Sequence, residues 1–421
     1  MELASAPPKS PPCRLQRSFS VEPNLRQSSL FNFYQPKSGI PKRDRTSKVK
    51  PKPSDLSKDG QSPSFSYPRA LMKTKSLPAN SSARVYKCPL YKRIPGTDMT
   101  VDAFSYGSID GCSSYFLTHF HSDHYTGLGR HFKHPIYCSK ITANLVKKRL
   151  GVNQRFVVPL PMRTPVTLRG VEVTLLDANH CPGSVMFLFV LPDGQVILHT
   201  GDFRASADME TYPELRGNCI DVLYLDTTYM NPRYCFPKQC DVIRYVVRIA
   251  SEAVRKEPKT LIVCGTYSIG KERVFLALAK ALGFKIGLAK EKMALLSCLE
   301  DPEMNSIASH DFLSCQIHVL PMGHLSLKKL DMHLSEYKSK FNSLLAFKPT
   351  GWTYSSRAKN LRDIKPSTKR GVTIYGVPYS EHSSYDELRQ FVRFLRPGRI
   401  VPTVNVKSTN EMQKTFREWL T

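Results

Sequence analysis

The sequence has few acidic residues, no closely paired cysteines and no long apolar run. It contains 35 Asp and Glu against 61 Lys and Arg, a formal net charge of +26. None of the 11 cysteines forms a Cys-x-x-Cys pair, so we expect reduced thiols in an intracellular protein rather than a disulfide framework. No stretch approaches the roughly 20 apolar residues of a membrane-spanning helix. The positive charge favours a polyanionic partner, although charge alone does not choose between nucleic acid, an anionic membrane and an acidic protein.

Residues 1–85 differ in composition from the remainder of the chain. They contain 16 Ser and 12 Pro, and carry 16 Lys and Arg against 5 Asp and Glu, a net charge of +11. A segment of this composition buries too little apolar surface to offset its chain entropy, so we expect it to be disordered. The remaining residues keep a net charge of +15, which predicts a folded part that is basic in its own right.

From residue 86 onward the pattern is that of a folded α/β protein. Short β-branched and aromatic runs between Gly, Pro and Asp predict buried strands. We expect them at Tyr115–Phe120, Val171–Asp177, Val185–Leu191, Val196–His199 and Val222–Asp226. A three-layer α/β region should follow, with helices Asp241–Lys256 and Lys271–Leu282 and strands Leu261–Cys264 and Gln316–Leu320. The tail predicts strand Val372–Val377, helix Tyr385–Leu395, strand Ile400–Val406 and a last helix.

The strongest chemical signal is the segment Thr118–His124, which reads THFHSDH. On an extended chain His119 and His121 point to the same side, because side chains alternate, while Asp123 and His124 fall on the turn beyond. Neutral imidazole and carboxylate are donors that zinc accepts. Four such donors within six residues predict a metal site.

Two further candidate ligands follow predicted strands: His180 in DANHCPG and Asp202 in HTGD. A carboxylate placed between two ions can bridge them, as two-metal hydrolases require. Taken alone, a histidine or aspartate at the end of a strand is more often an ordinary turn or cap residue. Only their occurrence together with the first segment favours metal binding.

In combination, these residues resemble the metallo-β-lactamase superfamily, in which HxHxDH is followed by a later His and a later Gly-Asp. The segments Leu225–Tyr229 (LDTTY) and Pro378–Ser384 (PYSEHSS) resemble its β-CASP nuclease branch. Four runs resemble the DNA cross-link repair nucleases, the group that includes Artemis and Apollo, and most closely its A-type branch. These runs are Thr118–Gly127, Asp177–Gly183, Gly265–Glu272 and Pro378–Tyr385.

The resemblance implies an α/β fold, namely a metallo-β-lactamase αββα sandwich with an inserted β-CASP α/β domain. The first part of the sandwich would occupy residues 86–228, the β-CASP domain 229–371 and the return segment of the sandwich 372–421. One tight zinc ion would be held by His119, His121, His180 and Asp202, and a weaker second divalent ion by Asp123, His124 and Asp202. Asp102 would be the structural aspartate that steadies the ligand loop, although a plain turn aspartate has nearly the same signature.

The resemblance also implies which residues handle the substrate. His382 would serve the leaving 3′ oxygen, Asp226 would orient its imidazole, and Asp123 completes the candidate catalytic set. The run Gly265–Lys271 follows a strand and opens a helix, where backbone N–H groups can cradle a phosphate, although a solvated cap is the commoner meaning of such a run. Its glycine and lysine spacing excludes a Walker A loop. The implied pocket for a 5′ phosphate consists of Tyr229, Ser268, Gly270 and Lys271.

These expectations define a zinc-dependent 5′ to 3′ DNA exonuclease that acts on 5′-phosphorylated ends in the repair of interstrand cross-links and other damage. Its substrate would be single-stranded or end-frayed duplex DNA, and the protein a monomer with no membrane partner. Valine in the run Ile400–Val404, where RNA-cleaving β-CASP enzymes carry histidine, favours DNA over RNA. Three alternatives stay open: a structure-selective endonuclease that opens hairpins or overhangs, a clamp-bound repair scaffold with vestigial activity, and an RNA-processing enzyme.

The basic tail carries two recognition signals. QSSLFNFY at 27–34 fits the pattern of a peptide that binds the PCNA sliding clamp. In a short helical turn, Leu30, Phe33 and Tyr34 would share one apolar face beside Gln27, although random hydrophobic residues in a linker can give the same pattern. The basic residues from Lys42 to Lys52 indicate nuclear import or DNA tethering, with a merely solubilising linker as the alternative. We therefore expect a nuclear protein.

Overall fold

The computed structural model describes residues 87–351 and 360–421. The expected clamp-binding residues Gln27, Leu30, Phe33 and Tyr34 and the basic import segment lie outside these ranges. The described residues form three β-sheets, of four, six and seven strands. The first two contain the segments that carry the candidate metal ligands.

The four-stranded sheet is entirely parallel and lies in the order β1-β2-β3-β4. Helix α2 (Lys140–Leu150) packs against one face through Leu145 and Val146. It begins at Ser139, whose side chain accepts a hydrogen bond from the backbone N–H of Thr142 and so caps the helix. The strands are β1 (Met99–Val101), β2 (Ser114–Phe116), β3 (Ile136–Ser139) and β4 (Val157–Leu160).

The six-stranded sheet is mixed and lies in the order β17-β9-β8-β7-β6-β5. Alternate side chains of β7 enter different cores, because neighbouring residues of a strand face opposite sides. Phe187 and Phe189 pack with Phe116 of the first sheet, whereas Leu188 belongs to the core that contains the last two helices. The strands are β5 (Val166–Leu168), β6 (Val171–Asp177), β7 (Val185–Val190), β8 (Val196–His199), β9 (Val222–Leu225) and β17 (Arg399–Pro402).

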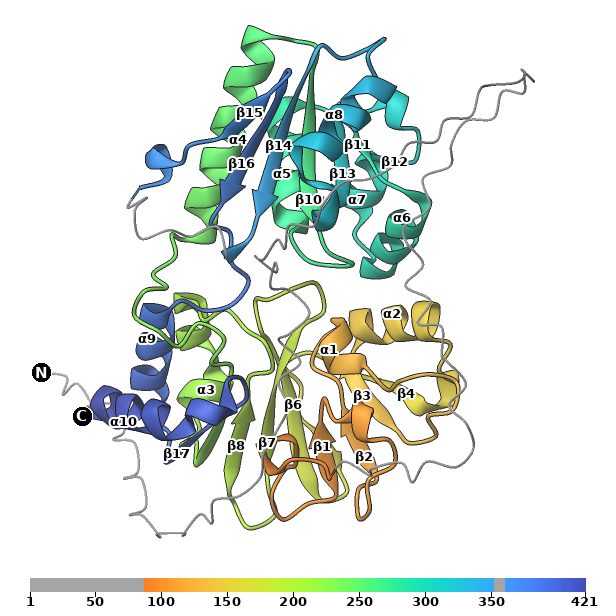
Figure 1. Ribbon diagram of the computed structural model, residues 1–421. Helices are drawn as coiled ribbons and strands as arrows, with labels where there is room; N and C mark the ends of the chain where they lie inside the picture. Colours follow the sequence, from red (N-terminus) through yellow and green to blue (C-terminus); the bar gives the residue numbers. More distant parts are fainter. Residues whose placement is uncertain (1–86, 352–359) are drawn as a thin grey trace, which may run out of the picture. The chain divides into compact units, whose positions relative to one another are not determined.

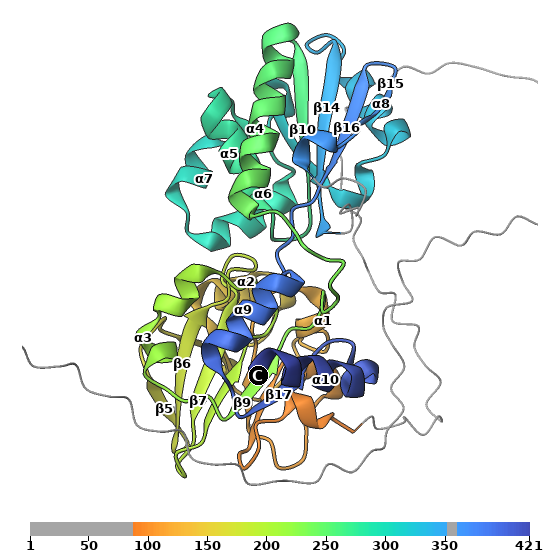
Figure 2. The same ribbon diagram turned by 90° about the vertical axis from the view of Figure 1, so that its left-hand side faces the viewer.

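Helices α9 (Tyr385–Leu395) and α10 (Thr409–Leu420) cover the other face of this sheet (Figures 1 and 2). Phe391, Phe416 and Trp419 pack with strand residues such as Leu198 and Leu223 in one buried cluster. With α2 on the first sheet, the layers follow the order helix, sheet, sheet, helix. The predicted αββα sandwich is therefore present.

The seven-stranded sheet lies between helices in a three-layer arrangement (Figure 1). Helices α4 (Gln239–Lys256) and α5 (Glu272–Leu282) share one core with its strands, and α8 (Leu327–Glu336) shares another. Shorter helices are α6 (Lys290–Leu296) and α7 (Pro302–Ile307). The strands are β10 (Thr260–Thr266), β11 (Ile286–Gly287), β12 (Ala308–Ser309), β13 (Ile317–Pro321), β14 (Ser343–Pro349), β15 (Ser367–Lys369) and β16 (Val372–Val377).

The structure corrects the expected assignment of β16. We expected Val372–Val377 to begin the return segment of the sandwich, but this strand pairs in parallel with β14 from Leu344 to Pro349. It also pairs in antiparallel orientation with β15. The seven-stranded sheet thus gains a strand, and the chain re-enters the six-stranded sheet only at β17, beside β9. We propose that the domain boundary falls after Val377.

The Ser-x-x-Glu spacings of Ser384 with Glu387 and of Ser408 with Glu411 each predict a capping box at the start of a helix. The capping box between Ser384 and Glu387 at the start of α9 is confirmed, because each side chain bonds the backbone N–H of the other residue. A second box, predicted from Ser408 and Glu411, is wrong, since Ser408 makes no side-chain cap bond.

Within the ranges 87–351 and 360–421, no helix combines the length and apolar character needed to cross a bilayer.

Candidate metal centre

The first candidate ligands lie on a loop that follows β2. The strand that we expected at Tyr115–Phe120 ends at Phe116. His119 and His121 therefore do not lie on a strand, and the alternation of side chains along a strand does not explain why they point to the same side. Asp123 and His124 lie on the one-turn helix α1 (Ser122–Tyr125) immediately beyond. The loop therefore folds back on itself and presents its imidazoles inward.

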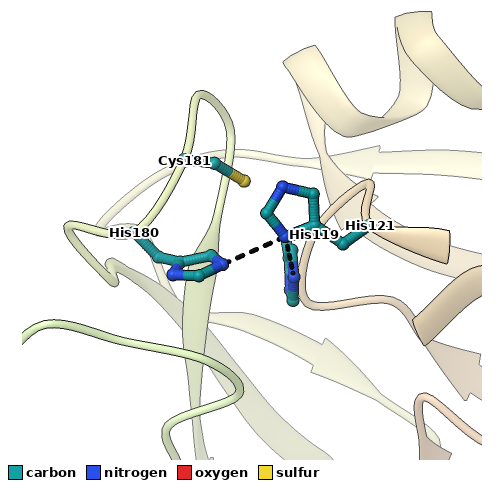
Figure 3. Close-up of side chains that lie close together, drawn as sticks. All are labelled: His119, His121, His180 and Cys181. Atoms are coloured by element: carbon teal, nitrogen blue, oxygen red, sulfur yellow. Dashed lines mark hydrogen bonds between the residues drawn. The ribbon is translucent and has the colours of Figure 1, made fainter. Parts of the chain in front are cut away.

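Three imidazole nitrogens converge at one point (Figure 3). His121 Nδ1 lies 3.0 Å from His119 Nε2 and 3.1 Å from His180 Nε2. His180 comes from the loop after β6, so two distant segments meet here. Three nitrogens this close can share a cation as their common partner.

The other nitrogen of each of the three rings has an acceptor of its own. His121 Nε2 donates to the Ile269 carbonyl over 3.2 Å, and His180 Nδ1 donates to the Glu381 carbonyl over 2.8 Å. His119 Nδ1 lies 2.9 Å from the Thr118 hydroxyl. Because a carbonyl only accepts, these bonds place the ring proton away from the convergence point and leave a lone pair directed toward it.

Asp202 brings a carboxylate to the same point. Its Oδ2 lies 3.7 Å from His119 Nε2, 3.9 Å from His180 Nε2 and 3.3 Å from His124 Nε2. It is thus within reach of both the three converging imidazoles and His124. Asp123, whose side chain is 72% exposed, reaches His124 Nε2 over 3.6 Å from the solvent side. This arrangement provides the expected first set of ligands and a second, more open set next to it.

Asp102 holds the ligand loop in place through hydrogen bonds to Thr118 and His124. The residue directly follows β1 and is buried. Its carboxylate accepts hydrogen bonds from the backbone N–H and the hydroxyl of Thr118, over 2.9 and 2.7 Å. It also accepts one from His124 Nδ1 over 2.7 Å. One carboxylate therefore orients both ends of the ligand loop, in the way expected of a structural aspartate.

Gly201 allows the loops to approach closely. Its φ is +56°, and a Cβ at this position would lie 2.7 Å from the Thr118 side chain. Any larger residue would push the loop that carries Asp202 away from the loop that carries His119. Steric crowding therefore explains why glycine, and no larger residue, precedes Asp202.

Burial keeps the converging imidazoles neutral. It lowers the pKa of His119 and His180 well below the usual range, with added repulsion from neighbouring imidazoles, and it also lowers the pKa of His121. For His124, burial acts in the same direction, but the charges of Asp202 and Asp102 outweigh it and raise the pKa. Neutral imidazoles beside a carboxylate fit a divalent transition-metal ion.

His382 and Asp226 form a hydrogen-bonded pair beside this cluster. His382 Nδ1 lies 2.8 Å from Asp226 Oδ2, and the His382 ring lies 4.7 Å from that of His180. Burial lowers the pKa of His382, but the charge and hydrogen bond of Asp226 outweigh it and raise the pKa to about 9. His382 can therefore hold a proton at neutral pH.

In the structure, the backbone amides of the predicted phosphate cradle bond to carboxylates of the chain itself. The backbone N–H of Gly270 donates to Glu272 over 2.9 Å, and that of Lys271 donates to Glu381 over 2.7 Å. The Lys271 ammonium also bonds Glu381, over 2.7 Å. These carboxylates take up the groups that we expected to bind phosphate. Of the remaining members of the predicted pocket, Ser268 is exposed and Tyr229 is 4% exposed.

Several site residues were missed by the sequence analysis. Cys181 is buried with its thiol near the three converging imidazoles (Figure 3), and burial raises its pKa well above the usual value. It is thus a protonated thiol and a weaker donor than Asp202. Glu381 accepts a hydrogen bond from His180 through its carbonyl, and Lys292 bonds the Ser268 carbonyl, next to the residue whose carbonyl accepts from His121. The positions of Cys181 next to His180 and of Glu381 next to His382 could have indicated these two residues, whereas no sequence signal marks Lys292.

Comparisons with known proteins agree with this geometry. Residues 106–256 match the family model described as β-lactamase superfamily domain, and residues 302–408 match DNA repair metallo-β-lactamase. Over 351 residues the chain is 53% identical to the human DNA cross-link repair 1A protein, covering 82% of the chain and 34% of that protein. It is 52% identical to the Arabidopsis thaliana DNA cross-link repair protein SNM1 over 347 residues, covering 81% of the chain and 71% of that protein.

A more distant similarity points the same way. The chain is 36% identical over 312 residues to the 5′ exonuclease Apollo of Gallus gallus, covering 74% of the chain and 63% of that protein. The chain spans about a third of the length of the vertebrate 1A proteins that it matches.

Proposed function

The chain belongs to the DNA cross-link repair group of metallo-β-lactamase proteins, in its A-type branch, and from this premise we propose that it is a metal-dependent DNA nuclease. The convergence of three imidazole nitrogens on a carboxylate carries the proposal. His119, His121, His180 and Asp202 would hold the first ion. Asp123, His124 and Asp202 would offer a second, more open position. Zinc suits these donors, because it accepts nitrogen and carboxylate oxygen together.

A divalent ion bound there supplies a Lewis acid that polarises a phosphodiester and activates water. The chain's own residues supply the proton for the leaving group and the contacts that orient its donor. His382 holds a proton at neutral pH and can give it to the leaving 3′ oxygen, while Asp226 keeps the ring oriented through Nδ1. Thr228 donates to the other Asp226 oxygen through its backbone N–H and its hydroxyl, so the aspartate itself is held in place.

We propose 5′ to 3′ exonuclease action on 5′-phosphorylated DNA, single-stranded or frayed from a duplex, in interstrand cross-link repair. The names of the related proteins, one of them a 5′ exonuclease, support this direction. The net charge of +15 on residues 86–421 supports a nucleic acid substrate. Ser268 and Tyr229 stay candidates for contact with the terminal phosphate, whereas the amides of Gly270 and Lys271 are already occupied.

The test uses the full chain loaded with zinc and oligonucleotides labelled at the 3′ end. We expect a ladder of products shortened from the 5′ end on 5′-phosphorylated DNA and much slower digestion of the 5′-hydroxyl strand. His119→Ala, prepared in the same way, is the inactive control. Equal digestion of both strands would reject the phosphate requirement, and internal cuts would favour the endonuclease alternative. The same oligonucleotide made as RNA tests the preference for DNA.

We further propose a nuclear location and binding to PCNA through Gln27, Leu30, Phe33 and Tyr34, with the protein acting as a monomer. The pattern of these residues supports clamp binding. A fluorescently labelled peptide of residues 24–38 should bind purified PCNA, and the same peptide with Phe33→Ala and Tyr34→Ala should not. Equal binding by both peptides would reject the assignment.

A further inference from the structure

A buried lysine organises the turn Tyr267–Glu272 between β10 and α5. The Lys292 side chain comes from α6 and is almost fully enclosed, at 1% exposure. Its ammonium donates to the carbonyls of Tyr267 and Ser268 over 3.1 and 3.0 Å, and to Glu272 over 3.2 Å. An ammonium with three oxygen partners has no donor left for a ligand. Lys292 thus holds the start and the end of the turn together.

Glu381 binds the same turn through Lys271. One of its oxygens accepts from the backbone N–H of Lys271 over 2.7 Å, and the other accepts from the Lys271 ammonium over 2.7 Å. Both side chains are 6% exposed. A Cβ at position 270 would lie 2.8 Å from Glu381 Oε2, and Gly270 has a φ of +98°. Glycine is therefore required where the carboxylate meets the turn.

The two segments joined by this ion pair also orient metal ligands. The turn presents the Ile269 carbonyl to His121 Nε2, and the loop after β16 presents the Glu381 carbonyl to His180 Nδ1. His121 and His180 are the two imidazoles whose facing nitrogens lie 3.1 Å apart. A change in the separation of the two segments would therefore rotate two ligand rings relative to each other.

We propose that Lys271 is a positioning residue, and that its ion pair with Glu381 sets the geometry and hence the divalent-metal affinity of the His121 and His180 ligand pair. The inference rests on the metal site of the proposed function. A buried ion pair contributes little net stability compared with apolar packing of the same volume. Geometry is thus the better explanation for an enclosed lysine and glutamate at this place. The β-CASP insert, which carries Lys271 and Ile269, is then part of the metal site.

The experiment measures zinc affinity by competition with a chelator, with the absorption spectrum of the cobalt-substituted protein as a second readout. Lys271→Met and Glu381→Gln should each weaken zinc binding about 10-fold to 100-fold, the usual effect of losing a group that orients a metal ligand. Their cobalt spectra should also change. Lys271→Arg, which keeps the charge and the pairing, should restore most of the affinity. The double variant should bind zinc no more weakly than the single variants, because both changes remove one interaction.

Lys280→Met is the matched control, since it removes an exposed lysine of helix α5 that pairs with Glu303 of helix α7. It should bind zinc as the unchanged protein does. If Lys271→Met does not fold, the Glu381→Gln variant tests the proposal, because the glutamine amide oxygen still accepts a hydrogen bond from the backbone N–H of Lys271.

Folded variants with unchanged zinc affinity and cobalt spectra would overturn the proposal. A defect confined to KM for 5′-phosphorylated DNA would also overturn it, because that outcome identifies Lys271 as a phosphate ligand. Failure of the unchanged protein to bind zinc or cleave DNA would instead reject the proposed function. The two failures are therefore distinguishable.

Discussion

Two buried groups of histidines show what separates a metal centre from a structural pair. In the sandwich, three imidazoles converge beside Asp202. In the seven-stranded sheet, His318 of β13 and His333 of α8 lie 2.9 Å apart, and His318 Nε2 also lies 2.9 Å from the Phe312 carbonyl. Burial lowers the pKa of both, to about 3 for His318 and about 4 for His333.

The difference between these groups is the presence of a carboxylate and the direction of the lone pairs. His318 and His333 share one ring proton between facing nitrogens and are surrounded by aromatic rings such as those of Phe312 and Tyr337. Among the residues that the structure describes, neither belongs to a group of three possible metal ligands. Proximity and burial of imidazoles are therefore insufficient, whereas outward hydrogen bonds and a nearby carboxylate create a site for a cation.

The largest expected effect comes from the carboxylate of the metal centre. Asp202→Ala removes a carboxylate within reach of both ligand sets, so DNA cleavage should fall about 1,000-fold or more, because loss of metal assistance costs several kcal/mol of transition-state stabilisation. Single-turnover cleavage and elemental analysis of bound metal check this. His333→Gln is the control from the other histidine group and should keep both activity and metal. Full metal content and full activity in Asp202→Ala would contradict the assignment.

The next effect separates His382 from the metal ligands. His382 lies close enough to His180 and Asp202 to be counted as a third donor, but its bond to Asp226 favours a role in proton transfer. His382→Ala should lower kcat about 100-fold or more, which is typical for loss of a general acid. Its metal content should stay unchanged. If metal is lost together with activity, His382 is a ligand and the proton-transfer role is wrong.

A stability effect is expected from the structural pair. His333→Gln removes the ring that bonds His318 Nδ1 in a closed environment, which should lower the free energy of unfolding by up to about 3 kcal/mol. Denaturant unfolding measured on metal-free protein checks this. The rate of DNA cleavage per folded molecule should not change, because the pair lies outside the metal centre. A loss of metal affinity in this variant would contradict the distinction between the metal centre and the structural pair of His318 and His333.

The smallest effect concerns pH. His333 has a folded pKa of about 4 and an unfolded pKa of about 6.5, so between these values the unfolded chain binds more protons. Stability is therefore present above pH 6.5 and is lost as pH falls. This histidine should contribute a loss of about 2 kcal/mol between pH 7 and pH 5. Comparing the pH dependence of unfolding in the unchanged protein and in His333→Gln isolates that contribution, and identical profiles would contradict it.

Much of the site could be predicted from the sequence, because its signals are local. Thr118–His124 places four donors within six residues, and the covalent chain keeps them close in any compact fold. Short β-branched and aromatic runs between turn residues predicted β6 and β8 with their observed bounds, and the serine and glutamate at the start of α9 predicted its cap. These features depend on neighbours in the chain, so the order of residues by itself determined them.

Only the tertiary structure decided which distant segments meet. Val372–Val377 was predicted as a strand, but its edge bonds to β14 and not to the sandwich, since strand propensity does not specify a partner. The sequence around Lys271 does not indicate its ion-pair partner, Glu381, which lies 110 residues later; phosphate binding by Lys271 stays a prediction. Such choices depend on the packing of whole layers and on the paired burial of charges, which no short segment encodes.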